Sequence, residues 1–144
     1  MNNFNIGGTI ADDKWVYKWL QITPTALASK GSYVLDLVAQ GYLPKNDNYD
    51  YELLLSAWIW TVSDAAGRSG NLVVYSGANT SARPLIYLLY AITRVEGYNC
   101  IQGHNCIMPL LNGNKTLCFY NGHNYAYSSW GIQLAGYRRL GTNV

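Results

Sequence analysis

The chain has 144 residues, of which 49% are apolar and only 12% are charged, and its formal net charge is +2. This length fits one domain that buries its own core, so folding requires neither a disulfide nor a metal. The low charge, with no basic cluster larger than Arg138-Arg139, excludes a surface built for phosphate backbones. An average globular protein has about 25% charged residues. We therefore expect polar loops or partner chains, most simply further copies of this chain, to cover the surface.

Residues 1–13 are irregular and rich in Asn and Gly, without the basic start or continuous apolar segment of a secretory signal. They are either an arm that docks elsewhere or a frayed terminus. No apolar run reaches the roughly 18 residues of a membrane-spanning helix, so we expect no membrane insertion. The odd cysteine count (Cys100, Cys106 and Cys118) favours reduced thiols over a disulfide framework, with a Cys100–Cys106 bridge as the alternative.

Strand-like alternation then recurs along the chain. Residues 14–22 alternate aromatic side chains with Val, Lys and Leu, and residues 32–37 place every second apolar side chain on one face. The longest candidate, residues 49–62, has one apolar face and a second face that ends in Trp58 and Trp60. Those two indoles need cover from another strand, a ligand or a second subunit.

Residues 84–95 are apolar at nearly every position, which fits a buried strand or a buried helix. The leading proline, the β-branched residues and the tyrosines favour a strand that is covered on both faces. Tyr87 and Leu89 in this run are candidate interface residues, together with Trp58 and Trp60. Residues 63–70 and 96–105 are predicted loops, whereas residues 107–111 and 116–120 are short strands joined by an Asn-Gly turn.

The last strand-like run, residues 125–142, has Trp130, Ile132 and Leu134 on its expected core side. Tyr137, Arg138 and Arg139 follow, either as inter-subunit contacts or as solvated tail residues. About eight strands separated by turn residues predict an all-β fold, an antiparallel jelly-roll-like β-sandwich. We assign it to residues 14–144, as one domain after the arm at 1–13.

Motifs for catalysis are missing from the sequence: it has no nucleophile elbow, no zinc-protease motif and no phosphate-binding loop. Asp50 and Glu52 share one side of a strand, but solvated carboxylates beside a loop explain them better than a glycosidase pair. Cys100, His104, Cys106 and His123 are an alternative zinc set, although Cys-x₅-Cys is not a standard zinc spacing. We therefore expect no enzymatic activity, no cofactor and no metal.

The tripeptide Gly-His-Asn occurs twice, at residues 103–105 and 122–124, and both copies are predicted to lie in loops. They are either simple turns with locally bonded histidines or parts of a polar and aromatic binding face. Such faces suit adaptable recognition and sugars. The candidate ligand-binding residues are Tyr98, Asn99, His104, Asn105, Tyr120, His123, Asn124 and Tyr125.

Three patches, at residues 6–16, 42–52 (YLPKNDNYDYE) and 135–143 (AGYRRLGTN), resemble small phage-encoded β-domains. These belong to head-fibre, tail-fibre and decoration proteins of phages that infect gut bacteria. The resemblance implies a homotrimeric sandwich or jelly roll on a virion, made in the host bacterial cytoplasm. It also implies contact with other virion proteins, a far end that can meet a host-surface glycan, and an attachment arm that includes Asn3, Phe4, Ile6, Gly7 and Gly8. A monomeric carbohydrate-binding module is the alternative function.

Overall fold

The computed structural model describes residues 14–24, 26–44, 48–61, 69–80, 84–92, 100–110 and 112–140. At 58–61, 69–71, 84–92 and 100–105 the description covers the backbone alone. The predicted arm at residues 1–13 lies outside these ranges, as do the candidate ligand-binding residues Tyr98 and Asn99. The described part of the chain contains strands, turns, bends and irregular segments but no helix, in agreement with the predicted all-β class.

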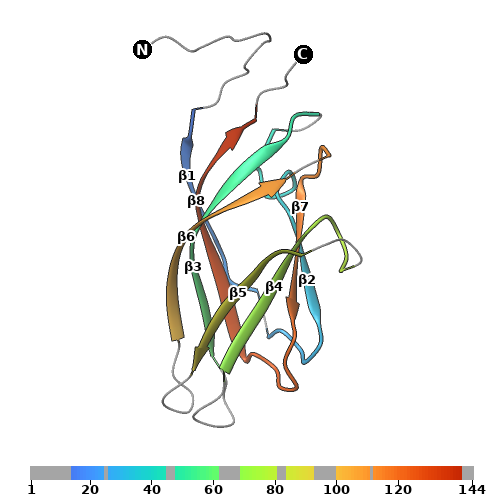
Figure 1. Cartoon of the computed structure of the whole chain (residues 1–144), viewed down its shortest axis with the longest axis vertical. Coiled ribbons are helices and arrows are strands. Elements are labelled where there is room, and N and C mark those ends of the chain that lie inside the picture. Colours follow the sequence, from blue (N-terminus) through green and yellow to red (C-terminus); the bar gives the residue numbers. More distant parts are fainter. Residues whose placement is uncertain are drawn as a thin grey trace.

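In the described residues, eight strands form two four-stranded sheets, with the orders β1-β8-β3-β6 and β2-β7-β4-β5. All neighbouring strands pair antiparallel. Figure 1 shows the sheets as two layers of an elongated sandwich. The strands are β1 (Val16–Ile22), β2 (Ser32–Asp36), β3 (Tyr51–Thr61), β4 (Ser69–Ser76), β5 (Pro84–Ile92), β6 (Cys100–Leu110), β7 (Thr116–Asn121) and β8 (Ser129–Arg139).

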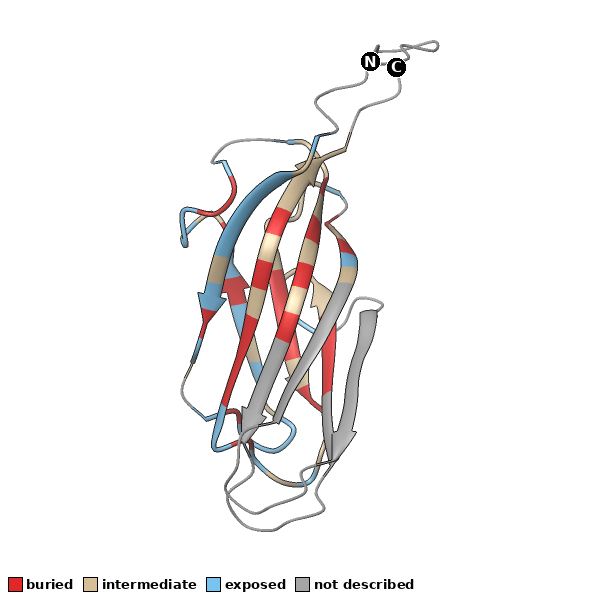
Figure 2. Ribbon diagram, turned by 90° about the vertical axis from the view of Figure 1, so that its left-hand side faces the viewer, coloured by how far each residue is buried: buried red, intermediate tan, exposed pale blue. Residues whose placement is uncertain are grey.

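The core lies between the two sheets and follows the alternation of the sequence. Buried and partly exposed residues alternate along the central strands in Figure 2. On β8, Trp130, Ile132 and Leu134 are 3%, 0% and 0% exposed, which confirms their predicted core side. Fully buried partners come from both sheets and include Leu35, Leu53, Leu55, Leu72, Val74, Leu117 and Phe119.

Strand β1 approaches β8 unusually closely at two glycines. Between Tyr17 and Leu20, β1 has one more residue than the facing segment of β8, which makes a β-bulge. A Cβ atom on Gly131 would lie 2.6 Å from the carbonyl oxygen of Ile22, and one on Gly136 would lie 2.7 Å from that of Val16. Only glycine therefore fits at these two positions of β8.

Strand β5 confirms that residues 84–92 are extended rather than helical. The turn at Asn112-Gly113 is also confirmed, because both residues have left-handed φ angles, 60° and 70°. The expected hairpin across it is wrong, because β6 pairs with β3 while β7 pairs with β2 and β4 in the other sheet. The predicted loop at 96–105 is wrong from Cys100 onward, since β6 begins there and pairs with β3 back to Trp60. Gly, His and Asn suggested a loop, but pairing along a long neighbouring strand overrides these local preferences.

The Cys100–Cys106 bridge is also wrong. Both cysteines lie on β6, where six residues of extended chain separate their Cα atoms by about 20 Å. A disulfide requires a Cα separation of less than about 7 Å. The Cys106 thiol is free, as is the buried Cys118 thiol, and burial raises the pKa of both.

We predict that Gly131→Ala lowers the free energy of unfolding by about 1–3 kcal/mol, because its methyl group would strike the β1 backbone. Urea denaturation followed by circular dichroism measures this loss. Ser129→Ala, at an exposed site of the same strand, should change the stability by less than about 0.5 kcal/mol. Equal effects of the two substitutions would contradict the close approach of β1.

Candidate functional site

The structure brings together only part of the predicted binding face. Tyr120, His123, Asn124 and Tyr125 lie at the end of β7 and in the turn that follows it. His104 and Asn105 lie instead within β6, in the other sheet, where Gly103 pairs with Ala57. The prediction that both Gly-His-Asn copies lie in loops is therefore right for the second copy and wrong for the first.

Asn121 holds the β7–β8 turn together from inside. Its side chain is fully buried, and its Nδ2 donates to the carbonyl oxygens of Tyr125 at 2.9 Å, Ala28 at 3.2 Å and Leu27 at 3.4 Å. Its Oδ1 accepts the backbone N–H of His123 at 2.9 Å. One amide thus satisfies polar groups of the turn and of residues 27–28, which lie about 90 residues earlier in the chain.

His123 packs within this turn. Its ring stacks on Tyr125, with the ring centroids 4.9 Å apart and the planes 16° from parallel. The Ser29 hydroxyl donates to the His123 carbonyl at 2.8 Å, and the Lys30 ammonium donates to the carbonyl of Gly122. The imidazole Nε2 is buried and has no hydrogen-bond partner in the described part of the chain. Burial lowers the pKa of this imidazole, and the Lys30 charge lowers it further.

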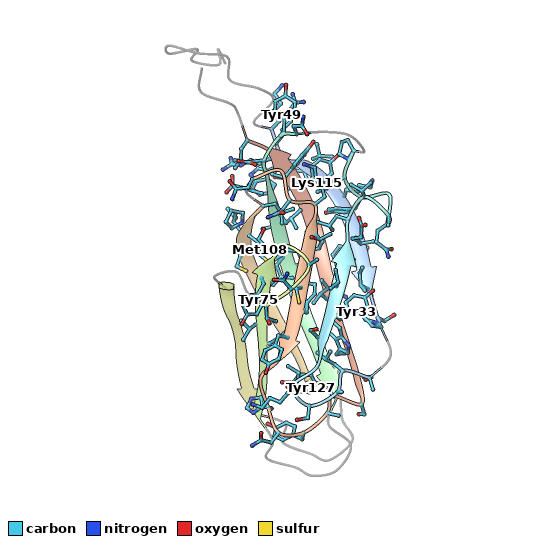
Figure 3. All side chains as sticks on the ribbon, turned by 90° about the vertical axis from the view of Figure 1, so that its right-hand side faces the viewer. Tyr33, Tyr49, Tyr75, Met108, Lys115 and Tyr127 are labelled. Carbon is cyan, nitrogen blue, oxygen red and sulfur yellow. The ribbon has the colours of Figure 1, made fainter. Side chains whose placement is uncertain are left out.

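A second candidate region lies at the opposite end of the sandwich, where β1 begins and β8 ends. Figure 3 shows Tyr49 and Lys115 near this end and Tyr127 near the other. Cations lie over aromatic rings throughout the region, which we call the cation–aromatic cluster. Lys115 lies 4.8 Å from the centroid of Tyr51, and Lys18 lies 5.4 Å from that of Tyr42.

The predicted interface residues Tyr137, Arg138 and Arg139 belong to this cluster. Arg138 Nε is 2.7 Å from Glu52 Oε1, and its guanidinium lies 5.0 Å from the Trp15 ring. Arg139 lies 4.2 Å from the Tyr49 ring. Neither arginine is a solvated tail residue, because both lie in β8 and contact their own chain.

The Tyr137 ring packs edge-on against two tyrosines, with centroids 5.5 Å from Tyr42 and 5.8 Å from Tyr51. The Tyr42 hydroxyl donates to the Lys18 carbonyl at 2.7 Å. Burial, with a smaller contribution from Tyr137, raises the pKa of Tyr42. The sequence did not suggest this cluster, because its rings come from β3, β8, the loop before β3 and the residue before β1, and no local spacing links them.

A pocket of about 190 Å³ opens beside the cation–aromatic cluster. Its walls come from the beginning of β1, the beginning of β3, the end of β8 and the loop that follows β2. The lining residues are Lys14, Val16, Pro44, Tyr51, Tyr137 and Arg139.

The candidate carboxylates are engaged in separate contacts. Asp50 Oδ1 accepts the Gly113 N–H at 3.0 Å, whereas Glu52 pairs with Arg138. The alternative zinc set is wrong, since Cys100 and Cys106 are about 20 Å apart along β6 and cannot bind one ion. Among the described residues, no group of three or more His, Cys, Asp or Glu side chains could hold a metal ion.

The outer face of the β1-β8-β3-β6 sheet exposes large apolar side chains. Tyr17 is 78% exposed, Trp19 57% and Ile107 47%. Cross-strand pairing places Tyr17 opposite Gly136, Gly136 opposite Leu54, and Leu54 opposite Ile107. An apolar band therefore crosses all four strands, and we call it the outer band. Of the candidate interface residues, Trp58, Trp60, Tyr87 and Leu89 have described backbones only.

No protein-family model and no curated protein matches the chain. The solved structures that are weakly similar include the following two. The Drosophila NLP core, studied for pentamer formation and histone binding, has a TM-score of 0.40 and 12% identity, over 85% of this chain and 97% of its own. The Tobacco streak virus coat protein, seen as a dimer, has a TM-score of 0.38 and 9% identity, over 85% of this chain and 86% of its own. Likeness at this level carries no argument about function.

In the described residues, no helix is long and apolar enough to span a membrane.

We predict that Asn121→Asp lowers the free energy of unfolding by about 1–3 kcal/mol, because a carboxylate cannot donate to the three carbonyl groups that the amide contacts. Thermal and urea denaturation measure the effect. The matched control is Asn124→Asp, an exposed site in the same turn, which should stay within about 0.5 kcal/mol of the native chain. Similar losses in both variants would mean that Asn121 does not organise the turn.

The lowered pKa of His123 predicts that stability falls in mild acid. The unfolded chain takes up this proton near the ordinary pKa of 6.5, whereas the folded chain takes it up only at lower pH. The free energy of unfolding should therefore decrease as the pH falls below about 6.5, and His123→Gln should reduce that slope. Titration of the His123 ring protons by NMR gives the pKa directly. A value at or above 6.5 would contradict the burial of the ring.

Proposed function

We propose that the chain is a virion structural protein, a homotrimeric head-fibre, tail-fibre or decoration module of a phage that attaches through residues 1–13. The observation that carries the assembly part of this proposal is the outer band. Tyr and Trp are enriched at protein interfaces, and contiguous exposed apolar surface marks interaction sites. The band also fits the low share of charged residues, 12%.

The edge position of β1 adds to this argument. β1 is an edge strand of its sheet, and Figure 2 shows it exposed along most of its length. Soluble proteins often guard such edges with projecting lysines. Here Lys18 folds back, and its Nζ donates to the Gly41 carbonyl at 2.7 Å. Tyr17 and Trp19 are left on an edge that a second copy can cover.

The strand orders support a jelly roll as the finer description of the sandwich. Each sheet takes strands from both halves of the chain, so that β1 pairs with β8 and β2 pairs with β7. This arrangement of eight strands serves viral capsid proteins and also lectins. The fold is thus compatible with both candidate functions, and the choice between them depends on surface features.

The two ends of the sandwich suit different tasks. Residue 14, where the proposed arm joins the domain, lines the pocket at the cation–aromatic end. The β7–β8 turn lies at the opposite end and presents the exposed Asn124. An arm that docks at one end leaves this turn free to meet a host-surface glycan.

The same turn favours the alternative, a monomeric carbohydrate-binding module. Asn124 supplies an exposed amide for sugar hydroxyls beside the His123–Tyr125 stack. However, His123 covers one face of the Tyr125 ring, which reduces the surface on which a sugar can stack. The assembly reading is therefore the better supported of the two.

We predict that sedimentation equilibrium gives the native chain a mass about three times the 16.1 kDa of one copy. The double variant Tyr17→Lys, Trp19→Lys should sediment as a folded monomer, because two charges cannot be buried without partners. Val34→Lys is the matched control: Val34 is 42% exposed, but it lies on β2 in the other sheet. It should leave the native mass unchanged.

A native chain that sediments as a monomer at micromolar concentration would overturn the assembly proposal. If that monomer also bound immobilised glycans in a saturable way, and Asn124→Ala abolished the binding, the alternative function would replace it. Assembly of the lysine double variant at the native mass would instead show that the outer band is not the interface.

A further inference from the structure

The pocket beside the cation–aromatic cluster has features of a binding site that assembly does not require. Its aromatic and apolar walls are Tyr51, Tyr137, Val16 and Pro44, and its charged groups are Lys14 and Arg139. None of these lining residues is acidic. An apolar cavity of about 150 Å³ binds benzene, so a volume of about 190 Å³ accepts a group of the size of benzoate.

The nearest candidate counter-ion is already engaged elsewhere. Cross-strand pairing sets Glu52 opposite Arg138 and Tyr51 opposite Arg139. Since side chains alternate between the two faces of a sheet, the Glu52–Arg138 ion pair lies on the outer face while Arg139 shares the inner face with Tyr51. Asp50 accepts a hydrogen bond from the Gly113 backbone.

Arg139 therefore lines the pocket as a cation without an anionic partner among the described residues. Its guanidinium lies over the Tyr49 ring, at 4.2 Å from the centroid. The Nε atom is buried, and no acceptor in the described part of the chain reaches it. A buried donor on a charged group is costly to leave unpaired, and a carboxylate is the acceptor that matches the guanidinium fork.

We propose that this pocket binds a carboxylate carried on an apolar or aromatic group. Arg139 holds the carboxylate, Lys14 adds a second positive charge, and the tyrosine rings with Val16 and Pro44 enclose the apolar part. The apolar walls suit the apolar group that carries the carboxylate, which inorganic phosphate lacks. All lining residues of the site come from one copy of the chain, so binding at this site does not depend on trimer formation.

The test is a titration of the ¹⁵N-labelled full chain, followed by its amide resonances. Sodium benzoate should produce saturable shifts around residues 14–16, 51 and 137–139, and benzamide, which has the same shape without the charge, should not. N-acetylphenylalanine and its amide form a second pair of ligands. Comparing their binding tests whether the carboxylate can come from a polypeptide terminus. Binding by either acid supports the proposal, and the comparison of the two acids identifies the source.

Adjacent arginines provide matched variants. Arg139→Gln should weaken acid binding about tenfold or more, because the charged hydrogen-bond partner is lost. Arg138→Gln removes the same charge from the outer face and should leave the affinity within about twofold. If Arg139→Gln does not fold, Lys14→Gln replaces it, with an expected weakening of about threefold.

Three results would overturn the proposal. The first is the absence of saturable shifts with both acids up to their solubility limits. The second is equal binding of each acid and its amide, which would leave no role for the charge. The third is equal weakening by Arg138→Gln and Arg139→Gln, which would indicate a general effect of net charge rather than a site.

Discussion

The contact that Trp130 makes between the two sheets is the one on which the sandwich depends. Its indole, on β8, lies 5.5 Å from the Tyr33 ring of β2 and 5.7 Å from the Phe119 ring of β7. Stacked sheets are about 10 Å apart, so a ring of this size spans the space between them. Once Trp130 points inward, the period of two sends Ile132 and Leu134 inward as well, and the register of β8 is set.

A shift in register then reverses this alternation. Leu134 of β8 pairs with Leu55 of β3, and Gly136 pairs with Leu54. Between these pairs β8 advances by two residues while β3 advances by one, which makes a β-bulge. Beyond the shift, Tyr137 and Arg139 pair with the buried Leu53 and Tyr51, while Arg138 pairs with Glu52. Two adjacent arginines consequently serve different surfaces. Arg138 is neutralised on the outer face by Glu52. Arg139 lines a pocket in which none of the described lining residues is acidic.

Local patterns in the sequence predicted the strands well and their partners poorly. Alternation sufficed for β2, β3 and β8, because one face of each is buried against the other sheet. It failed for the first half of β6, where Gly103 and its neighbours resemble a loop but pair with β3. The cation–aromatic cluster could not be predicted either, since contacts such as Arg138 with Trp15 and Lys115 with Tyr51 depend on strand order, which alternation does not encode.

The central claim is that another copy of the chain covers the outer band. Hydroxyl-radical footprinting of the native chain tests it most directly, because side-chain oxidation rates follow exposure. In a single copy Tyr17 is 78% and Trp19 57% exposed. If a second copy covers the band, both side chains should oxidise several-fold more slowly in the native chain than in the urea-unfolded chain. Oxidation rates close to those of the unfolded chain would contradict it.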